Sequence, residues 1–142
     1  MAYYRTIDAN LARLSEGLRV IEDMCRFELC HENSTAACKA IRTQLKEASQ
    51  AFAQPCLVNA RSTGTDVRAK SSVPKRATLT DLMTANIKRA TEACRTLEEC
   101  TDQQQFSHIR YDIYDLEQQI WHHLTRVSLQ GPGIYVVSDS PE

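Results

Sequence analysis

The stretch DANLARLSEGLRVIE at residues 8–22 returns in closely related form as TANIKRATEACRTLE at residues 84–98. Both copies place five polar residues at every third position, in the order Asn, Arg, Glu, Arg, Glu. We call each set a ladder. The first ladder is Asn10, Arg13, Glu16, Arg19 and Glu22, and the second is Asn86, Arg89, Glu92, Arg95 and Glu98. This repeat, displaced by 76 residues, predicts a chain built from two related halves.

Apolar residues between the rungs predict that each ladder lies on a helix. They recur in steps of three and four, as in one stripe of an amphipathic helix, at Leu11, Leu14, Leu18, Ile21 and Cys25 and again at Ile87, Ala90, Cys94 and Leu97. Each ladder is followed by another periodic segment, and these two segments share an Ile-Arg pair at residues 41–42 and 109–110. We therefore expect helices over 6–31, 34–54, 79–101 and 104–129.

This pattern predicts an all-α protein, a four-helix-type bundle made of two duplicated helical hairpins. A long basic loop, residues 55–78, joins the hairpins. Pro55 is expected to end the second helix, and Thr78 with Asp81 resembles a capping box that starts the third. Residues 1–130 form the predicted helical domain. Residues 131–142 carry Gly-Pro-Gly and a short apolar run, which predict a linker and the first strand of a following domain.

Composition sets limits on location and partners. The chain has 142 residues, 42% hydrophobic and 25% charged, with a formal net charge of −1. Such a balance is typical of a globular domain and provides no overall positive field for nucleic acid. No apolar run approaches the roughly 20 residues of a membrane span, and the N-terminal residues do not resemble a signal peptide. The sequence predicts a cytoplasmic protein that binds neither nucleic acid nor membrane.

The ladders have two possible roles. Arg and Glu three residues apart form surface ion pairs worth roughly 0.2–0.5 kcal/mol each, and such pairs need no particular order. Because both copies keep one order, the pattern also suits a ligand site, where Arg binds phosphate and Glu orients Arg or holds Mg²⁺. A second apolar strip, Val20, Met24 and Phe27, indicates that a loop, a second subunit or a fused domain covers this face.

The connecting loop is longer than most connections in compact domains. It contains five basic residues and one acidic residue, namely Arg61, Arg68, Lys70, Lys75, Arg76 and Asp66. Basic side chains beside hydroxyl groups suit a lid that closes over phosphates. Residues 64–71 also resemble a P-loop pattern, with Ala69 in place of the last glycine, but a P-loop follows a strand and none is predicted here. No aromatic residue lies in the loop to stack on RNA bases.

Taken together, these motifs resemble those of a known family. The segments concerned are residues 8–10, 13, 16–23 and 26–27 in the first copy, 85–86, 89 and 92–99 in the second, and Arg61, Asp66 and Arg76 in the loop. They are similar to the helical hydroxymethylpyrimidine phosphate kinase domain found N-terminal to some bacterial thiamine-phosphate synthases. The apolar run at 134–139 resembles the first barrel strand of the synthase.

The resemblance implies a function in thiamine biosynthesis. The domain would use ATP and Mg²⁺ to convert hydroxymethylpyrimidine phosphate to the diphosphate, with a C-terminal synthase barrel in the full-length chain. It implies catalytic roles for Arg19, Arg95, Glu16 and Glu92, substrate or nucleotide binding by Asn10, Arg13, Asn86, Arg89, Arg61, Asp66 and Arg76, and metal binding by Glu22 and Glu98. The alternative is a non-catalytic helical module that forms a homodimer or docks the barrel.

Overall fold

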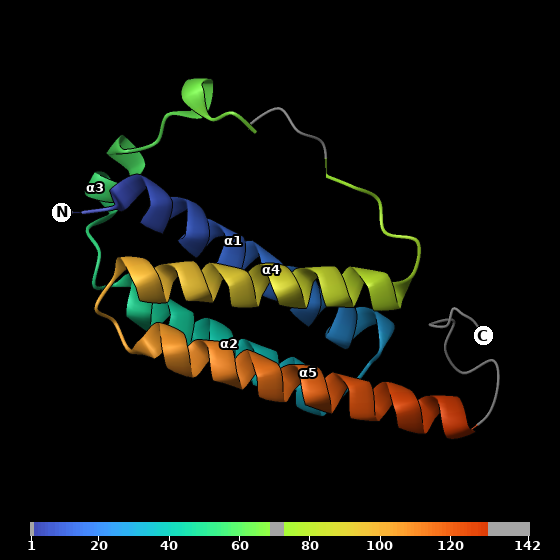
Figure 1. Ribbon diagram of the computed structural model, residues 1–142. Helices are drawn as coiled ribbons and strands as arrows, with labels where there is room; N and C mark the ends of the chain where they lie inside the picture. The colour runs from blue at the N-terminus through green and yellow to red at the C-terminus, as the bar shows by residue number, and fades with distance from the viewer. Residues whose placement is uncertain (1, 69–72, 131–142) are drawn as a thin grey trace.

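The computed structural model describes residues 2–68 and 73–130 (Figure 1). Its elements are α1 (Tyr4–Asp23), the π-helical turn η1 (Met24–Glu28), α2 (Glu32–Ser49), α3 (Gln54–Asn59), the 3-10 turn η2 (Thr63–Thr65), α4 (Leu79–Cys100) and α5 (Gln105–Gln130). No strand occurs among the described residues, so the all-α prediction is confirmed. The predicted linker and strand at 131–142 lie outside them.

The four long helices form two layers (Figure 1). Antiparallel α1 and α4 make one layer and antiparallel α2 and α5 the other, with α1 against α2 and α4 against α5 across the layers. The apolar stripes predicted from the sequence meet in one core, where Leu14, Leu18, Ile21 and Leu97 are fully enclosed. In the part of the chain that the structure describes, no helix has the length and apolar character needed to span a membrane.

Gly17 marks the closest approach of α1 to α4. A Cβ atom placed on it would lie 3.3 Å from the carbonyl oxygen of Asn86 and 3.6 Å from the Cβ of Ala90. Contacts under about 3.4 Å are tight, so a side chain at this position would force the helices apart. Glycine therefore lets the two ladder helices pack with their backbones almost in contact.

The helix boundaries differ from expectation in the first half of the chain. The second helix ends at Ser49 rather than 54, and Pro55 lies in the first turn of α3, where its missing N–H is harmless. The predicted loop 55–78 therefore contains α3 and η2. The ends of α4 and α5 are close to the predicted ones, and the Thr78 hydroxyl accepts a hydrogen bond from the Asp81 N–H at 3.0 Å, as the capping pattern predicts.

The first helix also ends differently. Instead of continuing to residue 31, α1 passes into the π-helical turn η1, and the chain reverses through Cys30, whose φ of 50° lies in the left-handed region. His31 then precedes α2. Cys25 and Leu29 are fully buried, so the turn is held down by its own apolar side chains.

Candidate functional site

The two ladders lie on neighbouring helices, α1 and α4, and run in opposite directions. Arg89 of α4 forms an ion pair with Glu16 of α1, at 3.8 Å between Nη2 and Oε1. Because the helices are antiparallel, a step of three residues on each brings Arg13 opposite Glu92 in one direction. The same step the other way brings Arg19 opposite Asn86. Each ladder is thus complementary to an antiparallel copy of itself.

The asparagine rungs turn inward and bind their own helices. The Asn10 amide donates to the carbonyl of Thr6 at 2.9 Å, and the Asn86 amide donates to that of Leu82 at 2.8 Å. The Oδ1 of Asn10 also accepts a hydrogen bond from Arg13 at 3.3 Å. The same local bond therefore fixes both asparagines, and the buried Asn10 holds the neighbouring arginine in place.

The last glutamate of each ladder binds an arginine of the other layer. Glu22 accepts a hydrogen bond from Arg42 at 2.6 Å, and Glu98 accepts two from Arg110, one of them at 3.1 Å. These arginines belong to the repeated Ile-Arg pairs. Glu22 and Glu98 thus orient arginines and tie each ladder helix to the following helix. Their role as metal ligands stays a prediction, and the described residues contain no cluster of three or more His, Cys, Asp or Glu placed to hold a metal ion.

The second arginine of each ladder is exposed to solvent. The side chains of Arg19 and Arg95 are each 62% exposed. Arg19 pairs with Asp23 at 3.3 Å and Arg95 with Glu99 at 2.6 Å, each one helical turn further on. Such pairs leave several guanidinium N–H groups free to bind a ligand. The antiparallel packing puts these arginines toward opposite ends of the α1–α4 face.

The middle glutamates also face solvent. The Glu16 side chain is 69% exposed despite its long contact with Arg89. Glu92 is exposed as well, and none of the ion pairs among the described residues includes it. The face between the two exposed arginines therefore carries two accessible carboxylates and the cations Arg13 and Arg89.

The connecting loop is tied to the start of α1. Arg61 donates two hydrogen bonds to Asp8, at 2.7 and 2.9 Å, and this carboxylate raises the pKa of Arg61. Arg5 donates to the carbonyl of Ser62 and to the hydroxyl of Thr65, both at 3.0 Å. Arg61 thus contacts α1 near Asn10, but the observed bond is to Asp8 and not to a ladder residue.

The remaining predicted loop residues lie apart from the ladders. Asp66 accepts a hydrogen bond from the Arg68 N–H at 3.0 Å, which closes a local turn. Arg76 is exposed and precedes α4, which begins at the end of the bundle opposite the start of α1 (Figure 1). No hydrogen bond or ion pair within the described residues joins Asp66 or Arg76 to a ladder.

Five partner residues were not among the predicted site residues. Asp8 anchors Arg61, Arg42 and Arg110 bind the last rungs, and Asp23 and Glu99 pair with Arg19 and Arg95. The repeated Ile-Arg pairs were a usable signal for Arg42 and Arg110. No such signal marks Asp8, because Thr84 stands at the equivalent position of the second copy.

The predicted second apolar strip is mostly covered. Met24 is partly buried and packs against the core, and Val20 is partly buried too. Phe27 is 59% exposed, with the Arg26 guanidinium 4.8 Å from its ring centre. The strip therefore presents one aromatic ring to solvent rather than a continuous apolar surface.

Comparison with known proteins gives one family. The ThiD2 family matches residues 5–119. Thiamine-phosphate synthase of Nostoc punctiforme is 34% identical over 148 residues, and that of Synechocystis sp. is 34% identical over 155. That of Prochlorococcus marinus is 41% identical over 124 residues. No solved structure matches the chain.

These relatives are longer proteins. The alignments cover 98%, 99% and 78% of this chain but only 41%, 43% and 34% of the Nostoc, Synechocystis and Prochlorococcus proteins respectively. The chain therefore spans less than half the length of each. The family match, by contrast, covers most of this chain and includes both ladders and the loop between them. The chain belongs to the ThiD2 family.

Proposed function

We propose that this chain acts in thiamine biosynthesis as a kinase that converts hydroxymethylpyrimidine phosphate to the diphosphate, using ATP. Its similarity to thiamine-phosphate synthases supports the pathway. The observation that carries the kinase assignment is the pair Arg19 and Arg95. Both are exposed and occupy equivalent rungs of two antiparallel helices.

The reaction transfers a phosphoryl group from one phosphorylated molecule, ATP, to another. An oxygen of the substrate phosphate attacks the γ-phosphorus of ATP, a new P–O–P bridge forms, and the bond to ADP breaks. Catalysis of this transfer depends on positioning and on positive charge around the transferred group. Arg19 and Arg95 would each bind phosphate at one end of the face, and Arg13 and Arg89 would supply charge between them.

Each end combines residues from both ladders. The register places Arg19 opposite Asn86, and Arg95 opposite Asn10. Two equivalent half-sites result, one for the nucleotide and one for the pyrimidine phosphate. Asp23 and Glu99 each bind one side of the guanidinium group of Arg19 and Arg95, respectively. Because these side chains are already held, they lose less rotamer freedom when they bind a ligand.

The carboxylates on this face also suit a divalent ion. Mg²⁺ in nucleotide sites commonly takes one or two protein carboxylates and completes its shell with phosphate oxygens and water. Bound there, it would neutralise phosphate charge. Glu16 and Glu92 are exposed and could supply those ligands, whereas Glu22 and Glu98 are engaged with Arg42 and Arg110. We therefore favour Glu16 and Glu92 for the metal.

Two loop residues complete the proposed site. Arg61 is held near the Asn10 end by Asp8, and Arg76 precedes α4, which begins at the other end. If ligand phosphates replace Asp8 as the partner of Arg61, the loop closes over one half-site. Asp66 stabilises the turn that follows η2.

The test is turnover by the purified chain and two variants. We expect ADP and the diphosphate to form from ATP, Mg²⁺ and hydroxymethylpyrimidine phosphate. Arg19→Gln and Arg95→Gln should each lower kcat/KM by about 100-fold or more, the scale seen when one transition-state donor is removed. Lys46→Gln, on the other layer, is the matched control. Folded wild-type protein that forms no product, or variants as active as the control, would refute the assignment.

A second candidate is a non-catalytic module that docks a synthase barrel or forms a homodimer. It is favoured by Tyr111, Tyr114 and Trp121 of α5, which are 58%, 41% and 36% exposed. The positions of α2 equivalent to Tyr111 and Tyr114 carry Thr43 and Lys46, so the fold does not require aromatic residues there. Thermal melting separates the candidates, because Mg-ATP raises the Tm of a nucleotide-binding kinase and leaves that of a docking module unchanged.

A further inference from the structure

The turn of the first hairpin is longer than that of the second. The ion pairs Glu22–Arg42 and Glu98–Arg110 occupy equivalent places in the two hairpins. The glutamates, on α1 and α4, are 76 residues apart in the sequence, whereas the arginines, on α2 and α5, are 68 residues apart. Eight residues, 24–31, separate α1 from α2, whereas four, 101–104, separate α4 from α5. Residues 24–31 form η1 and the reversal to His31. Inserted π-helical turns occur frequently at functional sites, so this turn is a place to look for one.

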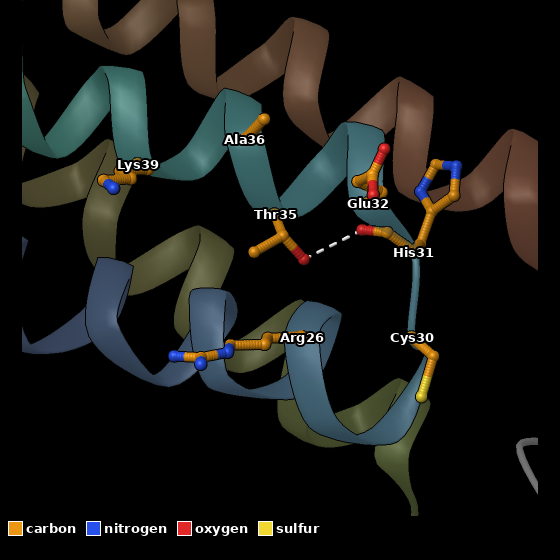
Figure 2. A pocket seen from close by; sticks show the side chains of 7 residues that line it. All are labelled: Arg26, Cys30, His31, Glu32, Thr35, Ala36 and Lys39. Atoms are coloured by element: carbon orange, nitrogen blue, oxygen red, sulfur yellow. Dashed lines mark hydrogen bonds between the residues drawn. The ribbon is translucent and has the colours of Figure 1, made fainter.

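The longer turn creates a cavity against α2. Its volume is about 360 Å³, and its lining residues are Arg26, Cys30, His31, Glu32, Thr35, Ala36 and Lys39. Figure 2 shows the Arg26 side chain extending along the space between η1 and α2, below Thr35. The Lys39 ammonium ends on the same side of the view, while the Glu32 carboxylate points away from both. None of the lining residues belongs to a ladder.

Both cations of this cavity lack a carboxylate partner. Six arginines of the described residues form ion pairs with Asp or Glu: Arg19, Arg42, Arg61, Arg89, Arg95 and Arg110. Neither Arg26 nor Lys39 is among the ion-paired residues of this part of the chain. The protein thus leaves two positive charges uncompensated at one concave site.

The wall of the cavity is fixed from two sides. The His31 ring stacks on His123 of α5 with their centres 3.9 Å apart, and its Nδ1 lies 2.7 Å from the hydroxyl of Ser34. The Thr35 hydroxyl donates to the His31 carbonyl at 2.8 Å (Figure 2). Contacts from both α2 and α5 therefore hold the turn, so the cavity is preformed rather than dependent on a loose loop.

We propose that this cavity binds a small phosphomonoester with a compact apolar body. Arg26 offers a planar fork for phosphate oxygens and Lys39 a second positive charge. The Ala36 side chain and the alkyl parts of Arg26 and Thr35 supply apolar contact. The volume is at the small end of the 300–1,000 Å³ range of ligand pockets, which suits a small molecule better than a nucleoside triphosphate.

Binding is tested with phenyl phosphate, measured by NMR titration of the purified chain. Wild-type protein should bind it at millimolar concentration or tighter. The double variant Arg26→Gln with Lys39→Gln should bind about tenfold more weakly or worse, because it loses both cations that bind the phosphate. Lys39→Gln alone should give a smaller loss. Lys46→Gln, on the same helix outside the cavity, should leave binding unchanged.

Two results would overturn this inference: no binding by the wild type, or binding that the double variant retains in full. Binding lost in Arg19→Gln but kept in the double variant would place the phosphomonoester on the ladder face instead, which also refutes it. The site is independent of the proposed kinase activity. Cavity binding that persists in a protein without turnover would refute the kinase and support the cavity.

Discussion

The two hairpins use the same contacts at equivalent positions. In each, an asparagine binds the carbonyl one turn back, an exposed arginine binds a carboxylate one turn on, and the last glutamate binds an arginine of the following helix. These shared contacts run along the helices or between the layers. They are what the bundle itself requires of each ladder.

The hairpins differ where the first carries extra groups. In the described part of the chain, the longer turn and its cavity belong to the first hairpin, and α1 is tied to the connecting loop through Asp8 and Arg5. Tyr111, Tyr114 and Trp121 of α5, in contrast, are exposed aromatic residues of the second hairpin. A repeated scaffold with unequal additions can bind unlike molecules at its two ends, and the differences show which groups are available for that.

A substitution that forces the ladder helices apart should have the largest effect on the free energy of unfolding. Gly17→Leu places a side chain where even a Cβ would lie 3.3 Å from the Asn86 carbonyl, and we expect it to lower the free energy of unfolding by about 3 kcal/mol. Ser15→Leu, on the exposed side of α1, should change it by less than about 0.5 kcal/mol. Urea denaturation measures both. Equal losses in the two variants would contradict the close packing at Gly17.

The two interlayer ion pairs should differ in strength. Both side chains of Glu98–Arg110 are 16% exposed, whereas Arg42 is 33% exposed beside Glu22. Because an unpaired charge costs more where water is scarcer, Glu98→Ala should cost about 2 kcal/mol and Glu22→Ala about 1. Glu99→Ala, which breaks a pair exposed on both sides, should cost less than about 0.5 kcal/mol. An inverted order in urea denaturation would show that exposure does not set the cost.

The smallest effect concerns the histidines at the first turn. Burial lowers the pKa of both His31 and His123, and the nearby Arg126 acts in the same direction. His123 also faces the His31 ring, which lowers its pKa further, while the Leu29 backbone raises it. The folded state therefore favours neutral rings, and stability should be full above about pH 6.5 and decline below it, as the unfolded chain takes up protons.

A pH series of thermal melts checks this. His123→Gln should flatten the decline in Tm below about pH 6.5, whereas His108→Gln, exposed on the same helix, should not. A decline of equal size in wild-type protein and His123→Gln would assign the acid sensitivity to other groups. The turn of the second hairpin, residues 101–104, contains no histidine, so no equivalent loss of stability at low pH is expected there.

The sequence predicted well those structural features whose pattern lies within a few neighbouring residues. Helix periodicity and the Thr78 cap arise within a few residues, so the ends of α4 were predicted closely. The π-helical turn was missed because one extra residue in a turn leaves no distinct pattern. Pro55 was misread, since proline is compatible with both the end of a helix and the first turn of another.

The site was predicted less completely for a physical reason. The ladder pattern identified helical faces, but the partners of Glu22, Glu98 and Arg61 come from other elements and depend on how the helices are rotated and aligned. A carboxylate that binds an arginine and one that binds a metal have the same sequence signature. The roles of the ladder residues toward ATP and substrate stay predictions.

The self-complementary ladder also has a consequence for assembly. The surface that α1 presents to α4 would be satisfied equally by an antiparallel ladder from a second chain, which is the condition for an isologous interface.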